Sequence, residues 1–243
     1  MSDRGAGRTR NEDACVARGD LLLVADGMGG YAGGDVAARL AAETLADPPL
    51  AAPPQAGAVR AAFERAHGRI REMAARHPGW QEMGTTLTAA WVGQGRLVVG
   101  HVGDSRAYLI RGGRATQLTQ DHSVAGELMR DGHLTQQEAR RHPQRHMLTR
   151  SLGGERAPEV DVVEVPLAPG DRLVLCTDGL TGALETDEIA RMVSGAHSAR
   201  EAADALLREA IRRQAPDDVT VVVAFVEADD LEREAAPGSV SMS

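Results

Sequence analysis

Acidic residues recur in this chain where short apolar runs end. Asp26 follows the run LLLVA, Asp104 follows VVGHVG, and Asp178 follows LVLCT. The full acidic set is Glu12, Asp13, Asp26, Asp104, Asp178, Asp217 and Asp218. A carboxylate beside a buried strand is costly unless it is paired or bound to a metal. One such residue is usually a turn former, but so many favour a cation site. Oxygen ligands without cysteine or paired histidine suit Mg²⁺ or Mn²⁺ better than Zn²⁺.

The chain contains no lysine, so arginine must supply every long basic partner for these carboxylates. Its 27 basic and 35 acidic residues give a net charge of −8. An acidic chain without a strong basic stripe is a poor nucleic-acid binder. No apolar run approaches the ~18–20 residues that span a bilayer, and the N-terminus has no apolar signal-peptide core. We therefore expect a cytoplasmic protein that binds neither nucleic acid nor membrane.

The histidines, cysteines and paired glycines of the chain do not form a zinc site, a thiol site or a P-loop by their spacing. His142 and His146 are four residues apart, but Pro143 and a dense arginine setting disfavour a zinc site. The arginines and histidines around them favour a solvated face, with recognition of acidic phosphopeptides as the alternative. Cys15 and Cys176 have no metal-ligand spacing and are expected to be buried, reduced thiols. The glycine pairs at 29–30 and 33–34 lack the Lys-Ser/Thr of a P-loop and predict a tight backbone instead.

Hydrophobic periodicity predicts several strands and four main helices. The strands are expected at 20–25, 85–92, 96–103, 106–111, 159–165, 171–177 and 219–226. The helices are expected at 35–46, 55–76, 186–194 and 198–214, with a short capped helix after Thr135. Glycines between the strands from 85 to 111 predict consecutive antiparallel hairpins. This order is no steady βαβ alternation, so it favours antiparallel sheets covered by helices. The tail 227–243 is expected to be disordered.

Seven segments together resemble the successive motifs of the bacterial type 2C, metal-dependent serine/threonine protein phosphatases. They include SDRGxxRxxNED, VADGMGG, HVGDSRAY, CTDGL and PDDVT. The seven lie at 2–13, 24–30, 84–86, 101–108, 118–123, 176–180 and 216–220. A single Asp-Gly pair carries no weight, but seven motifs in the family's order are specific. The resemblance implies one catalytic domain at 1–226, with the family's flap at about 121–154.

The resemblance also implies an α+β fold, a four-layer α-β-β-α sandwich of two antiparallel sheets flanked by helix pairs. It implies two Mn²⁺ or Mg²⁺ ions, and in many bacterial members a third. Carried over residue by residue, the metal ligands are Glu12, Asp26, the Gly27 carbonyl, Asp104, Asp178 and Asp217. Asp26 would bridge two ions, Asp104 would hold the third with Asp178, and Asp13 would orient a metal-bound water. Arg8 would bind the substrate phosphate as a bidentate clamp, which makes Arg8, Asp26 and Asp178 the expected catalytic residues.

The implied reaction is hydrolysis of phosphoserine and phosphothreonine in proteins. Two divalent ions lower the pKa of a shared water toward ~7, and the hydroxide attacks phosphorus. The expected partners are phosphoproteins and a bacterial Ser/Thr kinase whose action is reversed, and a monomer is expected. Three alternatives remain open: a phosphatase dedicated to one regulatory phosphoprotein (an anti-sigma antagonist or a secretion-system component), a non-catalytic phosphoprotein-binding relative, and a general phosphoesterase of small molecules.

Two positions depart from the family pattern. Eukaryotic relatives carry a histidine where this chain has Met28, which leaves the proton donor for the leaving group open. The residue after Asp217 is usually Asn and here is Asp218. We assign the metal role to Asp217 and a supporting role to Asp218. Thr85 and Thr86 follow a glycine at a strand start and are expected to be structural.

Overall fold

The computed structural model describes residues 1–28 and 33–228. The expected disordered tail lies outside this range from residue 229 onward. The predicted tight turn at Gly29 and Gly30 lies outside it as well. Every statement below concerns the described residues.

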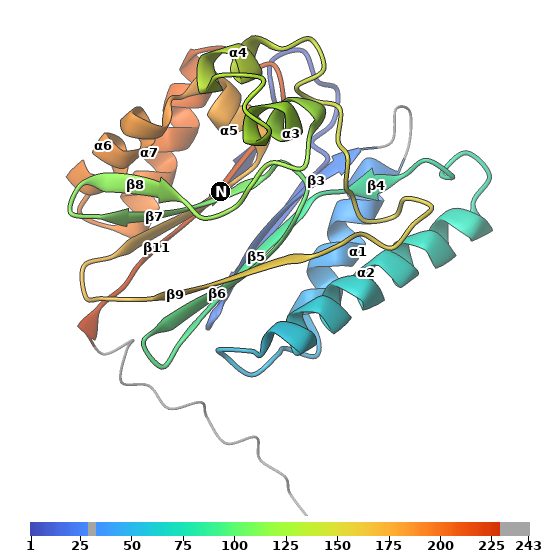
Figure 1. Cartoon of the computed structure of the whole chain (residues 1–243), viewed down its shortest axis with the longest axis horizontal. Helices are drawn as coiled ribbons and strands as arrows, with labels where there is room; N and C mark the ends of the chain where they lie inside the picture. The colour runs from blue at the N-terminus through green and yellow to red at the C-terminus, as the bar shows by residue number, and fades with distance from the viewer. Residues whose placement is uncertain (29–32, 229–243) are drawn as a thin grey trace, which may run out of the picture.

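Two antiparallel sheets form the centre of the molecule (Figure 1). One sheet has the order β1 (Ser2–Asp3), β11 (Val219–Phe225), β10 (Arg172–Cys176), β7 (Arg106–Arg111) and β8 (Arg114–Gln117). The other has the order β2 (Asp13–Arg18), β3 (Leu21–Met28), β5 (Leu87–Gly93), β6 (Arg96–Val102) and β9 (Asp161–Pro166), with β4 (Gly84–Thr85) beside β3. The long central strands have apolar side chains on both faces, so both sheets must be covered on both sides.

Side-chain alternation along the strands builds three apolar layers. Along β3, Leu21 and Leu23 belong to the core beneath one helix pair, whereas Leu22 and Val24 belong to the layer between the sheets. Along β10, Val174 lies under the other helices, while its neighbours on either side face the layer between the sheets. Successive residues of a strand point to opposite faces, so one apolar strand supplies two of the layers.

Helices cover the outer face of each sheet. The helices α1 (Gly34–Ala46) and α2 (Ala56–Arg76) pack on the sheet that contains β3. The helices α5 (Asp178–Ala183), α6 (Thr186–Gly195) and α7 (Ala199–Arg212) pack on the sheet that contains β11. Ser198 caps α7 by accepting a hydrogen bond from the Glu201 backbone. Within the described ranges, no helix is both long enough and apolar enough to cross a bilayer. The predicted α-β-β-α sandwich is confirmed.

The strand that carries Asp26 is longer than predicted. The apolar run was expected to stop at Asp26, yet β3 continues through Asp26 and Gly27 to Met28. The short strand β4 pairs with this extension, with Gly27 opposite Thr85 and Met28 opposite Gly84. The backbone of Asp26 therefore lies inside a sheet. The apolar run predicted too short a strand, because backbone hydrogen bonds and not apolar side chains define where a strand ends.

The prediction of consecutive hairpins is wrong at one step. The strands β5 and β6 do form a hairpin, but β7 pairs with β8 and β10 in the opposite sheet. The chain crosses between the sheets at Gly103, whose φ of 112° lies in the left-handed region that favours glycine. A Cβ there would also lie 2.5 Å from Thr86 Cβ. Local alternation predicts a strand but not the sheet to which it belongs, and the crossing places Asp104 at the sheet edge.

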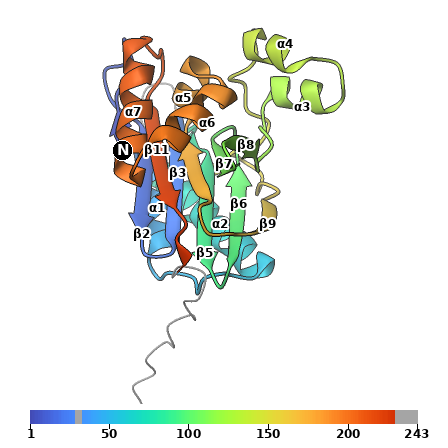
Figure 2. The ribbon, with the colours of Figure 1, turned by 90° about the vertical axis from the view of Figure 1, so that its left-hand side faces the viewer.

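The predicted flap at about 121–154 contains two short helices, α3 (Val124–Arg130) and α4 (Gln136–Arg141). Figure 2 shows both at the upper end of the molecule, beyond the strands. Thr135 and Glu138 form the predicted capping box of α4. The helix α3 was not predicted, because its seven residues are too few to show a clear period.

The two cysteines differ in exposure, so the prediction that both are buried is wrong for Cys15. Cys176 of β10 is fully buried, whereas Cys15 of β2 is exposed. Along β2, Ala14 and Val16 pack against the helix-covered core. Because side chains alternate along a strand, Cys15 points the other way from this edge strand. The apolar run alone could not distinguish the two faces.

Candidate functional site

The predicted site residues come from different elements whose ends meet at one edge of the two sheets. Asp26 lies near the end of β3, and Asp178 is the first residue of α5, just after β10. Asp217 lies just before β11, and Asp104 follows the crossing at the end of β6. Antiparallel strands bring these ends together although the residues lie far apart along the chain. The predicted site residues thus share one edge of the sandwich.

Two threonines hold the backbone of Asp26. The Asp26 amide donates a 2.9 Å hydrogen bond to Thr86 Oγ1, and Thr85 Oγ1 donates one of 2.9 Å to the Asp26 carbonyl. The hydroxyls of Thr86 and Ser105 are 2.7 Å apart, which ties the same position to the crossing loop. Both threonines are buried. These contacts agree with the structural role predicted for the Gly-Thr-Thr segment.

The carboxylates at this edge raise one another's pKa. Burial, followed by the charges of Asp13, Asp178 and other nearby aspartates, raises the pKa of Asp26 well above its usual range. Burial and the charge of Asp178 raise the pKa of Asp104 likewise. Burial raises the pKa of Asp13 to about 7 against the opposing hydrogen bonds of Thr177 and Thr220. Groups that are buried beside like charges favour the neutral form unless a cation compensates them.

Two of these carboxylates keep an oxygen without a partner. Asp13 accepts a 2.9 Å hydrogen bond from Thr177 Oγ1 on Oδ2, while its Oδ1 is buried and has no hydrogen-bond partner. Asp178 Oδ1 is also buried and without a partner. Buried polar atoms are nearly always satisfied, so an orphaned carboxylate oxygen points to a ligand or ion. The donor set of hard oxygens fits the predicted Mg²⁺ or Mn²⁺ ions.

Asp218 is committed to the backbone of the segment that carries Glu12. Its Oδ1 accepts from the Gly5 amide at 3.0 Å, and its Oδ2 accepts from the Glu12 amide at 2.9 Å. Both oxygens therefore act as acceptors, which an amide side chain could not reproduce. Burial raises the pKa of the Glu12 carboxyl itself. The geometry agrees with a supporting role for Asp218, and the metal role of its neighbour in sequence stays a prediction.

Gly27 lies where backbone segments approach very closely. A Cβ at this position would lie 2.2 Å from the Gly34 carbonyl oxygen and 2.6 Å from the Glu12 carbonyl oxygen. Only glycine fits such an approach. The predicted backbone ligand is therefore held between the start of α1 and the segment that carries Glu12.

Arg8 forms an ion pair with Asp217. The Arg8 side chain is 40% exposed, so one side of the guanidinium remains open to solvent. A planar guanidinium presents paired donors that match the oxygens of a phosphate. The predicted phosphate clamp thus lies beside a predicted metal ligand, as the role requires.

A pocket of about 200 Å³ separates the flap from the carboxylates. Asp104, Asp178 and Asp217 line one side, and Met129 and His146 of the flap are among the residues on the other. His146 Nδ1 lies 3.0 Å from Asp178 Oδ2, a flap contact that sequence reasoning missed. The sequence suggested a zinc site with His142, a solvated face or phosphopeptide recognition for His146, but no contact with a predicted metal ligand. The helix α4 ends at Arg141, so the two histidines do not share a helical face.

The site residues are gathered but do not form a closed cage. In the described part of the chain, no three His, Cys, Asp or Glu side chains are close enough to enclose a metal ion. Asp26 nevertheless feels the charges of Asp13, Asp104, Asp178 and Asp217. The residues present therefore fit the implied ions by chemistry, charge and orphaned oxygens. The individual ligand roles remain predictions.

Solved bacterial Ser/Thr phosphatases, one of them described as a PPM phosphatase, share this two-sheet sandwich. The family model "Protein phosphatase 2C" matches residues 5–214. The chain belongs to the protein phosphatase 2C family. The family predicted from the motifs is confirmed.

Relatives from several bacteria are similar over most of the chain. The serine/threonine phosphatase stp of Listeria monocytogenes is 35% identical over 233 residues, which cover 91% of this chain and 92% of that protein. The serine/threonine protein phosphatase PstP of Mycobacterium tuberculosis is 40% identical over 228 residues, 93% of this chain, but the match spans only 44% of PstP. A crystal structure of the PstP catalytic domain with two manganese ions has a TM-score of 0.85 at 36% identity, covering 93% of this chain and 96% of that one.

Proposed function

We propose that this protein hydrolyses phosphoserine and phosphothreonine in proteins with the help of divalent metal ions. The observation that carries the proposal is the group of aspartates at one sheet edge, two of which keep a buried oxygen without a partner. Membership of the protein phosphatase 2C family supports it, and so does the manganese bound to the related PstP catalytic domain. The class of reaction is metal-assisted hydrolysis of a phosphoric monoester.

The proposed metal ligands are the residues predicted from the motifs. They are Glu12, Asp26, the Gly27 carbonyl, Asp104, Asp178 and Asp217. When bound, two divalent ions supply an activated water near neutral pH and stabilise charge on the phosphoryl oxygens. The raised pKa of Asp26 supports this role, because a cation would relieve the repulsion that its charged form suffers.

Arg8 and Asp13 supply the remaining parts of the proposed mechanism. Arg8 exchanges its present partner Asp217 for the oxygens of the substrate phosphate, using its exposed side. The orphaned Asp13 Oδ1 accepts a hydrogen bond from the attacking water and orients it. Met28 has no ionisable group, and water is the proposed proton donor to the leaving seryl or threonyl oxygen. The pocket beneath the flap gives the phosphate group access to the predicted metal ligands Asp104, Asp178 and Asp217.

The proposed substrates are phosphoproteins modified by a Ser/Thr kinase, which this enzyme opposes. Relatives named as serine/threonine phosphatases, such as the stp protein matched over 92% of its length, support this substrate class. We propose that the enzyme acts as a cytoplasmic monomer. The choice of phosphoprotein is proposed to depend on the flap residues that line the pocket.

The test is phosphate release from a phosphothreonine peptide by metal-stripped protein with Mn²⁺ or Mg²⁺ added back. The variant Asp178→Asn should abolish release, whereas Asp171→Asn, a change at the opposite end of β10, should leave it intact. A nucleoside monophosphate serves as the counter-substrate and should be hydrolysed far more slowly. No metal-dependent release from any phosphopeptide by a folded wild-type protein would refute the proposal. Equal turnover of the nucleotide would replace it with a general phosphoesterase.

A further inference from the structure

Two buried histidines lie together at the base of the flap. The rings of His101, on β6, and His122, at the start of the flap, are 4.8 Å apart, and each residue is about 1% exposed. His101 Nε2 lies 3.0 Å from the Gln120 carbonyl, which can only accept, so Nε2 carries the proton. Its Nδ1 lies 2.8 Å from Thr88 Oγ1. Burial and the neighbouring His122 lower the pKa of His101 to about 4, so its ring is neutral at physiological pH.

His122 forms hydrogen bonds with both backbone groups of Gly103, its amide and its carbonyl. The Gly103 amide donates a 3.2 Å hydrogen bond to His122 Nδ1. The His122 amide donates one of 2.7 Å to the Gly103 carbonyl. His122 Nε2 lies 3.1 Å from Asp161 Oδ2, and the carboxylate can only accept. The Gly103 amide makes Nδ1 an acceptor, and Asp161 accepts the proton of Nε2. Arg150 Nη1, which can only donate, also lies near Nε2, but at the longer distance of 3.3 Å.

The backbone at Gly103 is also constrained by its conformation and by its packing. Gly103 is the residue at which the chain crosses between the sheets, with a left-handed φ and Thr86 packed where a Cβ would lie. It directly precedes Asp104, which is only 8% exposed. The direction in which Asp104 leaves the sheet therefore depends on how the Gly103 peptide is held.

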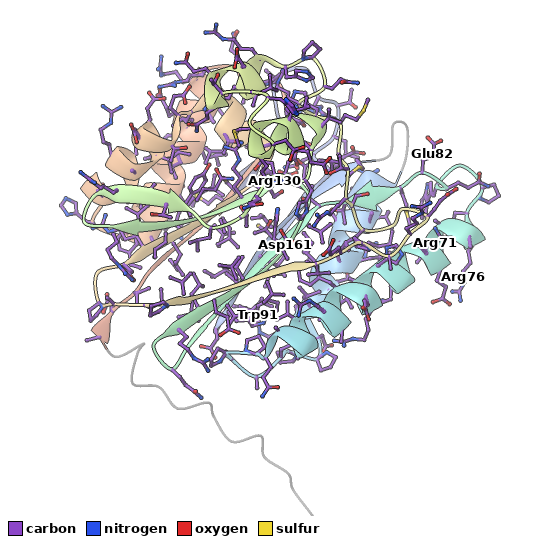
Figure 3. All side chains as sticks on the ribbon, viewed as in Figure 1. Arg71, Arg76, Glu82, Trp91, Arg130 and Asp161 are labelled. Atoms are coloured by element: carbon purple, nitrogen blue, oxygen red, sulfur yellow. The ribbon has the colours of Figure 1, made fainter. Side chains whose placement is uncertain are left out.

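The far side of His122 is tied to the end of the flap. Figure 3 labels Asp161 on β9, below the flap helix that carries Arg130. Arg150 Nη1 donates a 3.1 Å hydrogen bond to Asp161 Oδ1, opposite the oxygen that faces His122. The Thr149 amide donates a 2.9 Å hydrogen bond to the His122 carbonyl. Both ends of the flap thus meet at His122, whose ring also accepts the hydrogen bond of the Gly103 amide.

We propose that His122 is a positioning residue that sets the Asp104 carboxylate in the metal site and couples it to the base of the flap. The inference rests on the proposed function for the metal role of Asp104. It adds a residue to which no chemistry has been assigned. Asp161 and Arg150 orient the ring, and the Nδ1 acceptor transmits that orientation to the Gly103 amide.

Two substitutions separate the two nitrogens of His122. Asn places an oxygen near Nδ1, so His122→Asn keeps the acceptor for the Gly103 amide and loses the contact to Asp161. Gln places its polar end near Nε2, so His122→Gln loses that acceptor. We expect His122→Gln to weaken Mn²⁺ binding at the site that includes Asp104 by about 10–100-fold, the usual cost of losing a residue that orients a metal ligand. His122→Asn loses only the contact to Asp161, so Mn²⁺ binding at this site should weaken less than in His122→Gln.

The readout besides activity is a Mn²⁺ titration of metal-stripped protein by calorimetry, with Asp104→Asn as the reference. His122→Gln should weaken the same binding step that Asp104→Asn removes. A His122→Gln isotherm identical to the wild type, or a loss spread over every step, overturns the inference. Thermal unfolding of each metal-free variant identifies any loss that comes from misfolding. If His122→Gln does not fold, His122→Asn carries the test: a loss confined to the Asp104 step supports the inference, and a wild-type isotherm overturns it.

A double-mutant cycle on phosphopeptide hydrolysis gives the second readout. Because His122 acts through Asp104, His122→Gln should reduce activity in the wild type but have no further effect in the Asp104→Asn background. Additive losses would show a general structural role and overturn the inference. Failure of the proposed function is recognised separately, because the wild-type protein would then show no metal-dependent turnover while the titration still reports on His122.

Discussion

The two ends of β10 carry aspartates in opposite circumstances. Asp171, just before the strand, is 1% exposed and accepts two hydrogen bonds from Arg111, of 2.7 and 2.6 Å, and a third of 2.8 Å from the Ala168 amide. The Arg111 hydrogen bonds hold its pKa below the usual range. Asp178, just after the strand, keeps one buried oxygen without a partner, and its neighbour Asp26 has a pKa raised well above the usual range.

The difference separates a carboxylate that stabilises the fold from carboxylates that the fold must tolerate. At the Asp171 end, an arginine neutralises the charge inside the protein. At the Asp178 end, the only ion pair from the chain's arginines to a predicted metal ligand in the described residues is that of Arg8 with Asp217. Sites that bind ligands are often destabilised in this way, because their groups are arranged for the ligand and not for one another.

The largest effect is expected from a substitution among the aspartates at the Asp178 end of β10. Asp26→Asn should lower phosphopeptide hydrolysis by about 10³-fold or more, because metal ions contribute several kcal/mol to such reactions. The same change should raise the Tm of the metal-free protein at pH 8, because it removes a buried charge that its neighbours repel. Kinetics and thermal unfolding on one preparation check both outcomes. A lower Tm together with lost activity would mean that Asp26 supports the fold instead.

The next prediction compares two arginines that each hold an aspartate. Arg8→Ala should lower kcat/KM by about 10²-fold, the typical cost of losing one preorganised donor to a reacting group. Arg8→Lys should recover only part of this, because an ammonium cannot bind two phosphate oxygens in the same plane. Arg111→Ala is the matched control at the opposite end and should leave kcat/KM unchanged. An equal loss in both variants would contradict a specific phosphate-binding role.

A smaller effect is expected from a substitution at the Asp171 end of β10, where Arg111 neutralises the carboxylate. Asp171→Asn should lower the Tm by roughly 3–6 °C, because it weakens hydrogen bonds to a charged, buried group. Its folded-state pKa is depressed, so the stabilisation is present above about pH 4, near the unfolded pKa, and is lost as the pH falls further. The Tm difference between wild type and variant should therefore shrink below pH 4. A difference that stayed constant down to pH 2 would contradict the assignment.

The effect that is smallest near neutral pH concerns a buried base instead of a buried acid. His101 has a folded-state pKa of about 4, below its usual value near 6.5, because burial disfavours its charged form. The unfolded chain binds the proton first, so stability should be complete above pH 6.5 and fall as the pH drops toward 4. His101→Asn should flatten this part of the Tm profile relative to the wild type. Parallel profiles would show that His101 titrates normally.

Local patterns predicted the elements better than their long-range partners. The helix expected at 55–76 runs from Ala56 to Arg76, because its apolar stripe repeats over several turns. The crossing at Gly103 was missed, because pairing between sheets depends on residues far away in the sequence. The prediction that Cys15 is buried was wrong for a related reason, because the residue types of a strand do not show whether it lies at the edge of a sheet.

The candidate site shows the same division. Asp104 and Asp178 lie just after the strands that the sequence predicts before them, and Asp26 lies near the end of its strand. The environment of His122 could not be predicted, although the residue lies in the motif LTQDHS. Its partner Asp161 is 39 residues further along the chain and belongs to a different strand. The spacing of residues in a motif predicts which of them lie close together locally. The hydrogen bonds that hold such residues in place come from distant parts of the chain and become visible only in the fold.

The unequal exposure of the two cysteines offers a practical handle on the molecule. Burial raises the pKa of the Cys176 thiol to about 12, so it contains almost no reactive thiolate near neutral pH. Cys15 is exposed on β2, three residues from Glu12. A maleimide dye or spin label should therefore attach at a single position in the unmodified sequence. Such a reporter would follow events at the proposed metal-binding edge without any engineered cysteine.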